Sequence, residues 1–124
     1  MSKGRFGEKM AAKFLVKNGY FVCNANFISN FGEIDIVAKD KEFICFVEVK
    51  LRSSIHFAYP VEFVTKAKQR KIIKTAYLYL QEKPSILQPR FDVIEILIFK
   101  YHKYKLKIRH IKNAFNPGEL FEFC

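Results

Sequence analysis

The strongest chemical signal in this sequence is a pair of acidic residues, Asp35 and Glu48, followed by Lys50 two residues after Glu48. Glu48 stands within residues 43–51, an apolar run typical of a strand that is buried on both faces. Removing an isolated carboxylate from water costs on the order of several kcal/mol, so a charge there must be paired or hold a cation. Two carboxylates beside an ammonium group are suited to binding a divalent metal next to a phosphodiester.

A simpler interpretation of the same residues is an inter-strand salt bridge between Lys50 and either Asp35 or Glu48. A Glu-x-Lys triplet is common in strands and does not by itself predict catalysis. The salt bridge, however, explains neither Glu8 on the first predicted helix nor the inward position of Lys68. Glu8 also has a structural interpretation, because an acidic residue in the first turn favours the helix dipole.

The elements that position these residues follow from hydrophobic spacing. Phe6, Met10 and Phe14 recur at helical spacing and predict a first helix over residues 3–18, which Gly19 ends. The rest of the chain contains five strand-like segments and one long helical segment. The strands are predicted at residues 20–28, 33–38, 43–51, 91–99 and 105–111, and the helix at residues 61–83.

The first three strands are joined by short turns and therefore predict an antiparallel meander. Alternation places Asp35 on the face opposite Ile34 and Ile36, and it places Glu48 and Lys50 together on one face of the next strand. Asp35 and Glu48 are therefore expected to face each other across one pair of strands.

The long predicted helix carries two sets of polar residues. Lys68 falls within its apolar stripe and Gln69 at the edge of that stripe. Lys66, Arg70 and Lys74 form a basic ridge on the opposite face, where like charges weaken the helix unless an anion relieves them. Taken alone, this ridge is also explained as a solvated face.

Composition limits the classes of function. The 22 Lys and Arg residues exceed the 12 Asp and Glu residues by 22 − 12 = +10, which favours a polyanionic partner such as nucleic acid. Charge alone leaves ribosomal RNA, anionic membranes and a merely solvated surface as alternatives. The 3 His and 3 Cys residues are scattered, which disfavours a zinc site.

A length of 124 residues predicts one domain. No stretch has the apolar length of a membrane span, and the N-terminus has no apolar signal region, so we expect a cytoplasmic protein without a membrane partner.

At these positions the sequence resembles the PD-(D/E)xK nuclease superfamily, and more closely the YraN family of bacterial proteins related to the archaeal Holliday-junction resolvases. The resemblance extends from Gly4 to Phe115. Its main segments are Gly7-Glu8, Gly32-Glu33-Ile34-Asp35, Phe46-Val47-Glu48-Val49-Lys50 with Arg52, Lys68-Gln69-Arg70, Arg90-Phe91-Asp92-Val93 and His110-Ile111. One departure lies at Ile28 and Asn30, where relatives tend to carry arginines.

The resemblance implies an α/β fold with a restriction-endonuclease-like core. Its central mixed sheet would have five strands, with one helix at the N-terminus and a long helix between the third and fourth strands. Residues 1–115 would form the nuclease-like domain, and residues 116–124 would form a C-terminal tail.

The implied function is metal-dependent hydrolysis of DNA phosphodiester bonds, selective for branched DNA such as Holliday junctions. Glu8, Asp35, Glu48 and Lys50 would be the catalytic residues. Mg²⁺ or Mn²⁺ would be held by Asp35, Glu48 and the backbone carbonyl of Val49. A homodimer is implied by analogy, because a two-fold symmetric junction requires two symmetric cuts.

Nucleic-acid contacts are expected from basic and amide side chains near the site. They are Arg52, Lys66, Lys68, Gln69, Arg70 and Lys74. Two alternatives remain open: a module with a nuclease fold that binds nucleic acid without cutting it, and a nuclease that acts on RNA.

Overall fold

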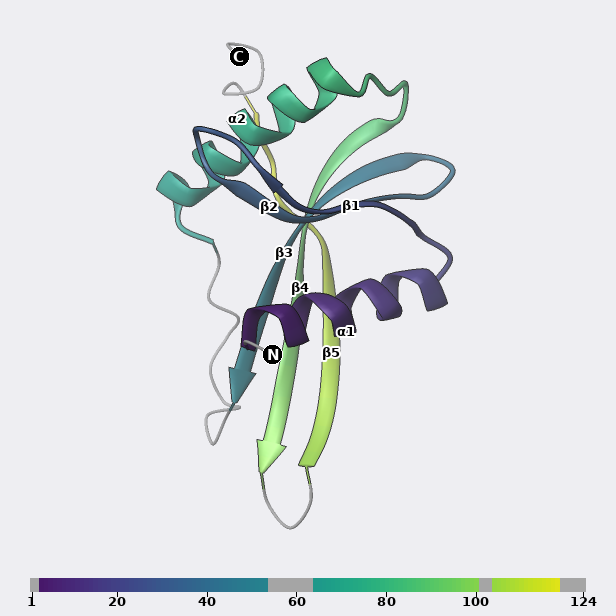
Figure 1. Ribbon diagram of the computed structural model, residues 1–124, viewed down its shortest axis with the longest axis vertical. Helices are drawn as coiled ribbons and strands as arrows, with labels where there is room; N and C mark the ends of the chain where they lie inside the picture. The colour runs from purple at the N-terminus through teal and green to yellow at the C-terminus, as the bar shows by residue number, and fades with distance from the viewer. Residues whose placement is uncertain (1–2, 54–63, 101–103, 119–124) are drawn as a thin grey trace.

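The computed structural model describes residues 3–53, 64–100 and 104–118 and contains two helices and five strands in that part of the chain (Figure 1). In chain order they are α1 (Lys3–Lys17), β1 (Phe21–Ile28), β2 (Glu33–Lys39), β3 (Phe43–Ser53), α2 (Lys66–Glu82), β4 (Gln88–Lys100) and β5 (Tyr104–Phe115). The strands form one sheet in the order β1-β2-β3-β4-β5. The α/β class, the five-stranded mixed sheet and the positions of both helices in the chain are confirmed.

The sheet is mixed because one connection differs from the others. Strands β1, β2 and β3 form an antiparallel meander, and β4 pairs with β5 in the same way. Strand β3 pairs with β4 in parallel. Parallel neighbours need a long crossover, which α2 supplies.

Helix α1 ends at Lys17, one residue before the predicted end, and Gly19 stops it as expected. Gly19 follows it with φ of 90°, a conformation that favours glycine, and the Tyr20 N–H donates to the Leu15 carbonyl over 2.9 Å. This bond directs the chain into β1.

Helix α2 begins later than the prediction of residue 61. Residues 61–63 lie outside the described part of the chain, but Val64 and Thr65 are described and are not helical. Thr65 is the N-cap, because its side chain accepts the N–H of Lys68. The Gln69 side-chain amide donates to the Val64 carbonyl over 2.8 Å, which further fixes this helix start.

Two hydrophobic clusters cover the two faces of the sheet. One includes Ile72, Ala76 and Tyr79 of α2, and the other includes Ala11 and Leu15 of α1. The helices therefore lie on different faces, and Figure 1 shows them well separated. No helix in the described ranges has the combination of length and apolar composition that a membrane crossing requires.

The alternation predicted for β2 is wrong at one step. Ile34 belongs to the cluster with α2, whereas Ile36 belongs to the cluster with α1. The β2–β3 register ends at the pair Ile36–Val47, while β2 continues along β1 to Glu33. The residues of β2 that precede Ile36 are therefore not paired with β3.

Strands β4 and β5 are longer than predicted. Strand β4 begins at Gln88, and β5 continues to Phe115 through Asn113, whose φ is 54°. Residues 119–124 of the predicted tail lie outside the described chain.

Strand β4 also carries a fully buried carboxylate, Asp92. It accepts hydrogen bonds from the Arg90 guanidinium, His110 Nε2 lies 2.8 Å from Oδ2, and the Asn113 N–H donates to Oδ1. The Arg90 guanidinium also donates to the Tyr20 hydroxyl. Burial alone would raise the pKa of Asp92, but these hydrogen bonds lower it. This network joins β4, β5 and Tyr20, which lies between α1 and β1.

We predict that Asp92→Ala lowers the free energy of unfolding by about 3–5 kcal/mol, because it leaves a buried guanidinium without its carboxylate. Urea unfolding monitored by circular dichroism measures the change. Lys13→Ala, on the exposed face of α1, is the control and should change stability by less than about 0.5 kcal/mol.

Wild type and Asp92→Ala also give a pH test. Because the pKa of Asp92 is lowered in the folded state, its carboxylate stabilises the protein at pH values above the ordinary pKa of 3.8. This contribution is lost as pH falls through the folded-state pKa. The difference between wild type and Asp92→Ala should therefore narrow in acid. A stability difference that widened in acid would contradict the conclusion that the ionised Asp92 carboxylate stabilises the fold.

Candidate metal and phosphate site

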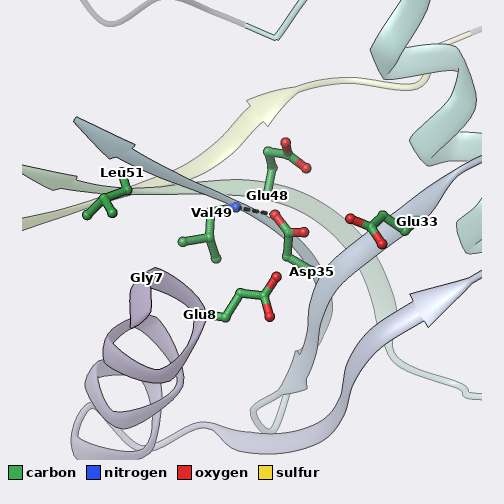
Figure 2. Close-up of a pocket in the computed structure, with 7 residues that line it drawn as sticks. All are labelled: Gly7, Glu8, Glu33, Asp35, Glu48, Val49 and Leu51. Carbon is green, nitrogen blue, oxygen red and sulfur yellow. Dashed lines mark hydrogen bonds between the residues drawn. The ribbon is translucent and has the colours of Figure 1, made fainter. Parts of the chain in front are cut away.

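A hollow of about 280 Å³ opens where β2 and β3 part, between the end of the β2–β3 register and the first turns of α1 (Figure 2). Its lining is mostly acidic on one side and apolar on the other. The residues are Gly7, Glu8, Glu33, Asp35, Glu48, Val49 and Leu51. Figure 2 shows Asp35 between Glu8 of α1 and Glu48 of β3.

Asp35 is held at the gap by a backbone contact. Its Oδ2 atom accepts the N–H of Val49 over 2.8 Å. The N–H and C=O of one strand residue point to the same edge of the strand. The Val49 carbonyl is therefore directed to the same hollow as the Asp35 carboxylate.

The turn before Asp35 is fixed against α2. The Ser29 N–H donates to the Gly32 carbonyl over 2.8 Å, and the Ser29 hydroxyl lies 2.9 Å from that of Thr75. A Cβ atom on Gly32 would lie 3.5 Å from the Lys71 Cβ, so the turn approaches the helix closely. These contacts fix the start of β2 relative to the helix that carries Lys68.

Glu48 is buried, with 7% of its surface exposed, and it pairs with a lysine from α2. Lys68 Nζ donates to Glu48 Oε1 over 2.5 Å. The Lys68 side chain itself is half exposed. A buried carboxylate is thus neutralised by an ammonium group that retains access to water.

The neighbouring carboxylates perturb Asp35. The pKa of Asp35 is raised to about 7 by its burial away from water and by the negative charge of Glu48, and the charges of Glu8 and Glu33 add to this effect. The hydrogen bond from Val49 opposes the shift. The hydrogen bond to Glu48 raises the pKa of Lys68, against the effect of burial. The site therefore concentrates negative charge that favours a cation.

The donor set fits a hard divalent ion with few protein ligands. Within residues 3–53, 64–100 and 104–118, no three His, Cys, Asp or Glu side chains are arranged to hold a metal by themselves. Asp35 and Glu48 together with the Val49 carbonyl would supply three oxygen atoms. Mg²⁺ commonly keeps several waters and binds through one or two carboxylates, so this set is sufficient.

Lys50 lies beside the hollow and does not line it. Its partner in the parallel register is Glu95 of β4, which is 3% exposed. Arg52 and Arg109 each pair with Glu95, over 3.2 and 3.3 Å. Glu95 was not among the residues predicted from the sequence, although an acidic residue within the apolar residues 93–98 is a signal of a buried, paired charge.

The predicted basic ridge lies on α2. Lys66 and Arg70 are exposed, and the Lys74 ammonium lies 5.4 Å from the centre of the Phe31 ring. Gln69 is engaged with the Val64 carbonyl at the start of the helix.

The structure brings together three of the four predicted catalytic residues and all three predicted metal ligands. Glu8, Asp35, Glu48 and Val49 line one hollow, and Lys68 contacts it through Glu48. Another acidic group at the hollow is Glu33, which belongs to the Gly32-Glu33-Ile34-Asp35 segment but had no predicted role.

Comparison with known proteins identifies a family. A family model described as "Uncharacterised protein family UPF0102" matches residues 7–96. A UPF0102 protein of Clostridium botulinum (strain Loch Maree / Type A3) is 45% identical over 115 residues, covering 90% of this chain and 92% of the relative. A UPF0102 protein of Caldanaerobacter subterraneus subsp. tengcongensis is 44% identical over 113 residues, covering 90% and 93%. Neither name states an activity.

We predict that Asp35→Asn stabilises the protein in metal-free buffer at pH 8. A pKa of about 7 in the folded state, against an ordinary value of 3.8, means that ionised Asp35 destabilises the fold. The amide retains an acceptor for Val49 without the charge. Since one pKa unit corresponds to about 1.4 kcal/mol, the expected gain is of the order of 2–4 kcal/mol.

The gain should be small at pH 4 and should grow until about pH 7, because the raised pKa lets the folded state retain a proton that the unfolded state loses. Thermal unfolding across this range measures it. Asp40→Asn is the matched control: hydrogen bonds from the Phe43 and Glu42 N–H groups lower the pKa of Asp40, so its replacement should not stabilise. A uniform gain at every pH would contradict the electrostatic explanation.

Proposed function

The chain belongs to the uncharacterised protein family UPF0102, and from its site we propose that it is a metal-dependent nuclease that hydrolyses DNA phosphodiester bonds, selective for branched DNA. The YraN family expected from the sequence is this same family. Its relation to the PD-(D/E)xK superfamily is part of the proposal.

One observation carries the proposal. Asp35 and Glu48, with the Val49 backbone, converge where β2 and β3 part, and a lysine already neutralises one of the two acids. A buried salt bridge alone would need one carboxylate. Here a second buried carboxylate, Asp35, adjoins the pair, and burial together with the negative charge of Glu48 raises the pKa of Asp35 to about 7.

The chain's own groups would divide the work of hydrolysis. The Asp35 and Glu48 carboxylates and the Val49 carbonyl would hold Mg²⁺ or Mn²⁺, and Glu8 would contact it through water. When bound, the cation would neutralise charge on the phosphate and make water more acidic. Lys50 would orient the attacking water or stabilise the negative charge that develops on the phosphate.

Binding of the DNA backbone would use positive side chains of α2 and β3. Lys66 and Arg70 are exposed on α2, and Arg52 follows Lys50 on β3. Lys68, Gln69 and Lys74 would complete this surface. A net charge of +10 supports a polyanionic ligand.

The order of elements also supports the superfamily relation. A helix, an antiparallel meander, a crossover helix and two further strands are what the resemblance implies, with Asp35 and Glu48 on adjacent strands. This support is an analogy of fold, so the site has to carry the function.

A homodimer in the cytoplasm belongs to the proposal as well, since paired cuts in a symmetric junction require two active sites. RNA is a second substrate class, because hydrolysis at phosphate does not itself depend on the sugar.

A second candidate function is binding of nucleic acid without cleavage. Its specific support is the Lys68–Glu48 contact, which already satisfies a would-be metal ligand. It differs from the first candidate in needing no divalent ion.

We predict that Glu48→Gln reduces Mg²⁺-dependent cleavage by about 10²-fold or more, as expected when a group that supports transition-state charge is lost. The assay is a panel of four-way, flapped, single-stranded and duplex DNA, and RNA, resolved on denaturing gels. Glu42→Gln, at an exposed acid between β2 and β3, is the matched control and should cut as wild type does. Normal cutting by Glu48→Gln would remove the catalytic assignment.

Binding measurements separate the two candidates. For a nuclease of the proposed kind, Mg²⁺ should strengthen binding of DNA by Lys50→Ala, a variant expected to leave DNA uncut. Equal affinity in Mg²⁺ and in EDTA, a steep dependence on salt and no cleavage by wild type would identify the binding module instead. Fluorescence anisotropy gives both affinities.

A further inference from the structure

The contact between Lys68 and Glu48 places a positive charge at one of the proposed metal ligands. Lys68 Nζ lies 2.5 Å from Oε1 of Glu48, and Glu48 is one of the residues that line the hollow. A divalent cation would need the same carboxylate. The Lys68 ammonium group and a divalent cation that both contact Glu48 would repel each other, so each weakens the binding of the other to this carboxylate.

The two partners differ in their exposure. The Glu48 side chain is 8% exposed, whereas the Lys68 side chain is 50% exposed. The carboxylate is fixed in the sheet. The ammonium group is at the end of a flexible chain and can exchange its partner for another anion near the surface.

Helix α2 also shows where such an anion would come from. Lys68 lies in the first turn, between the exposed residues Lys66 and Arg70. A nucleic-acid phosphate attracted by these residues would approach the helix start, where backbone N–H groups also favour negative charge. Lys68 could then reach a phosphate while leaving Glu48.

We propose that Lys68 is an internal counter-ion that weakens metal binding until a nucleic-acid phosphate draws it away from Glu48, so that metal and nucleic acid bind cooperatively. The inference rests on the proposed function. In it Lys68 is a positioning residue that acts through Glu48. The consequence is that a free protein binds the divalent ion weakly and acquires it together with its substrate.

A purely structural salt bridge predicts something different. Its removal would lower stability without linking the two ligands. Thermodynamic linkage makes the distinction measurable. If nucleic acid strengthens Mg²⁺ binding by drawing Lys68 away from Glu48, then Mg²⁺ must strengthen nucleic-acid binding by the same factor.

The first measurement is calorimetric titration of Mg²⁺ into protein without nucleic acid. Lys68→Met should bind Mg²⁺ about five-fold more tightly than wild type or better, within the range of typical coupling. Lys66→Met removes the same charge from the same helix turn and should change the affinity by less than about two-fold, because exposed charges are screened. Lys68→Arg restores a cation and should return the affinity toward that of wild type.

The second measurement repeats the titration with duplex DNA present, on proteins that also carry Lys50→Ala so that the DNA stays intact. DNA should tighten Mg²⁺ binding about five-fold or more when Lys68 is present. In Lys68→Met this enhancement should disappear. Melting curves without metal provide a check on folding, and Mg²⁺ should raise the melting temperature of Lys68→Met more than that of wild type.

Two outcomes would overturn the inference in distinguishable ways. If wild type binds Mg²⁺ and cleaves while Lys68→Met and Lys66→Met bind Mg²⁺ equally, or the DNA enhancement persists without Lys68, the counter-ion role is wrong and the nuclease proposal stands. If wild type and Glu48→Gln bind Mg²⁺ identically, the metal site is elsewhere and both proposals fall.

Discussion

The site depends on the high energy of a carboxylate that is removed from water inside a β-sheet. Glu48 lies in β3 beside Val93 of β4, one residue past the last pair that β3 makes with β2, and its buried carboxylate needs a cation there. Lys68 reaches Glu48 because α2 packs over the same face of the sheet. The Thr65 cap fixes the start of that helix and therefore the position of Lys68 in its first turn. The crossover helix that makes β4 parallel to β3 therefore also supplies the lysine that neutralises Glu48.

A second buried acid shows another solution to the same constraint. Asp92 is surrounded by donors from Arg90, His110 and the Asn113 backbone, and its pKa is lowered. Asp35 receives the Val49 N–H and lies among other acids, and its pKa is raised. Saturated hydrogen bonding is typical of a structural carboxylate, whereas an undercompensated cluster is typical of a functional site.

Much of this arrangement could be predicted from residue patterns. Helical spacing and Gly19 located α1, and apolar segments separated by turns located all five strands. Local rules failed at β2, where Ile34 and Ile36 pack on different faces. That failure arises because β2 loses its partner β3 at Asp35, which no single strand's pattern records. The same parting of strands creates the hollow.

The sequence by itself determined the fold class and the identity of the acids, because buried charge and hydrophobic periodicity are local properties of the chain. Tertiary structure decided which charges meet. Lys68 pairs with Glu48, while Arg52 turns to Glu95 on the neighbouring strand. These partners come from segments far apart in the sequence, and their pairing depends on the register of β3 with β4 and on the docking of α2. Such distances are fixed only when the whole sheet has formed.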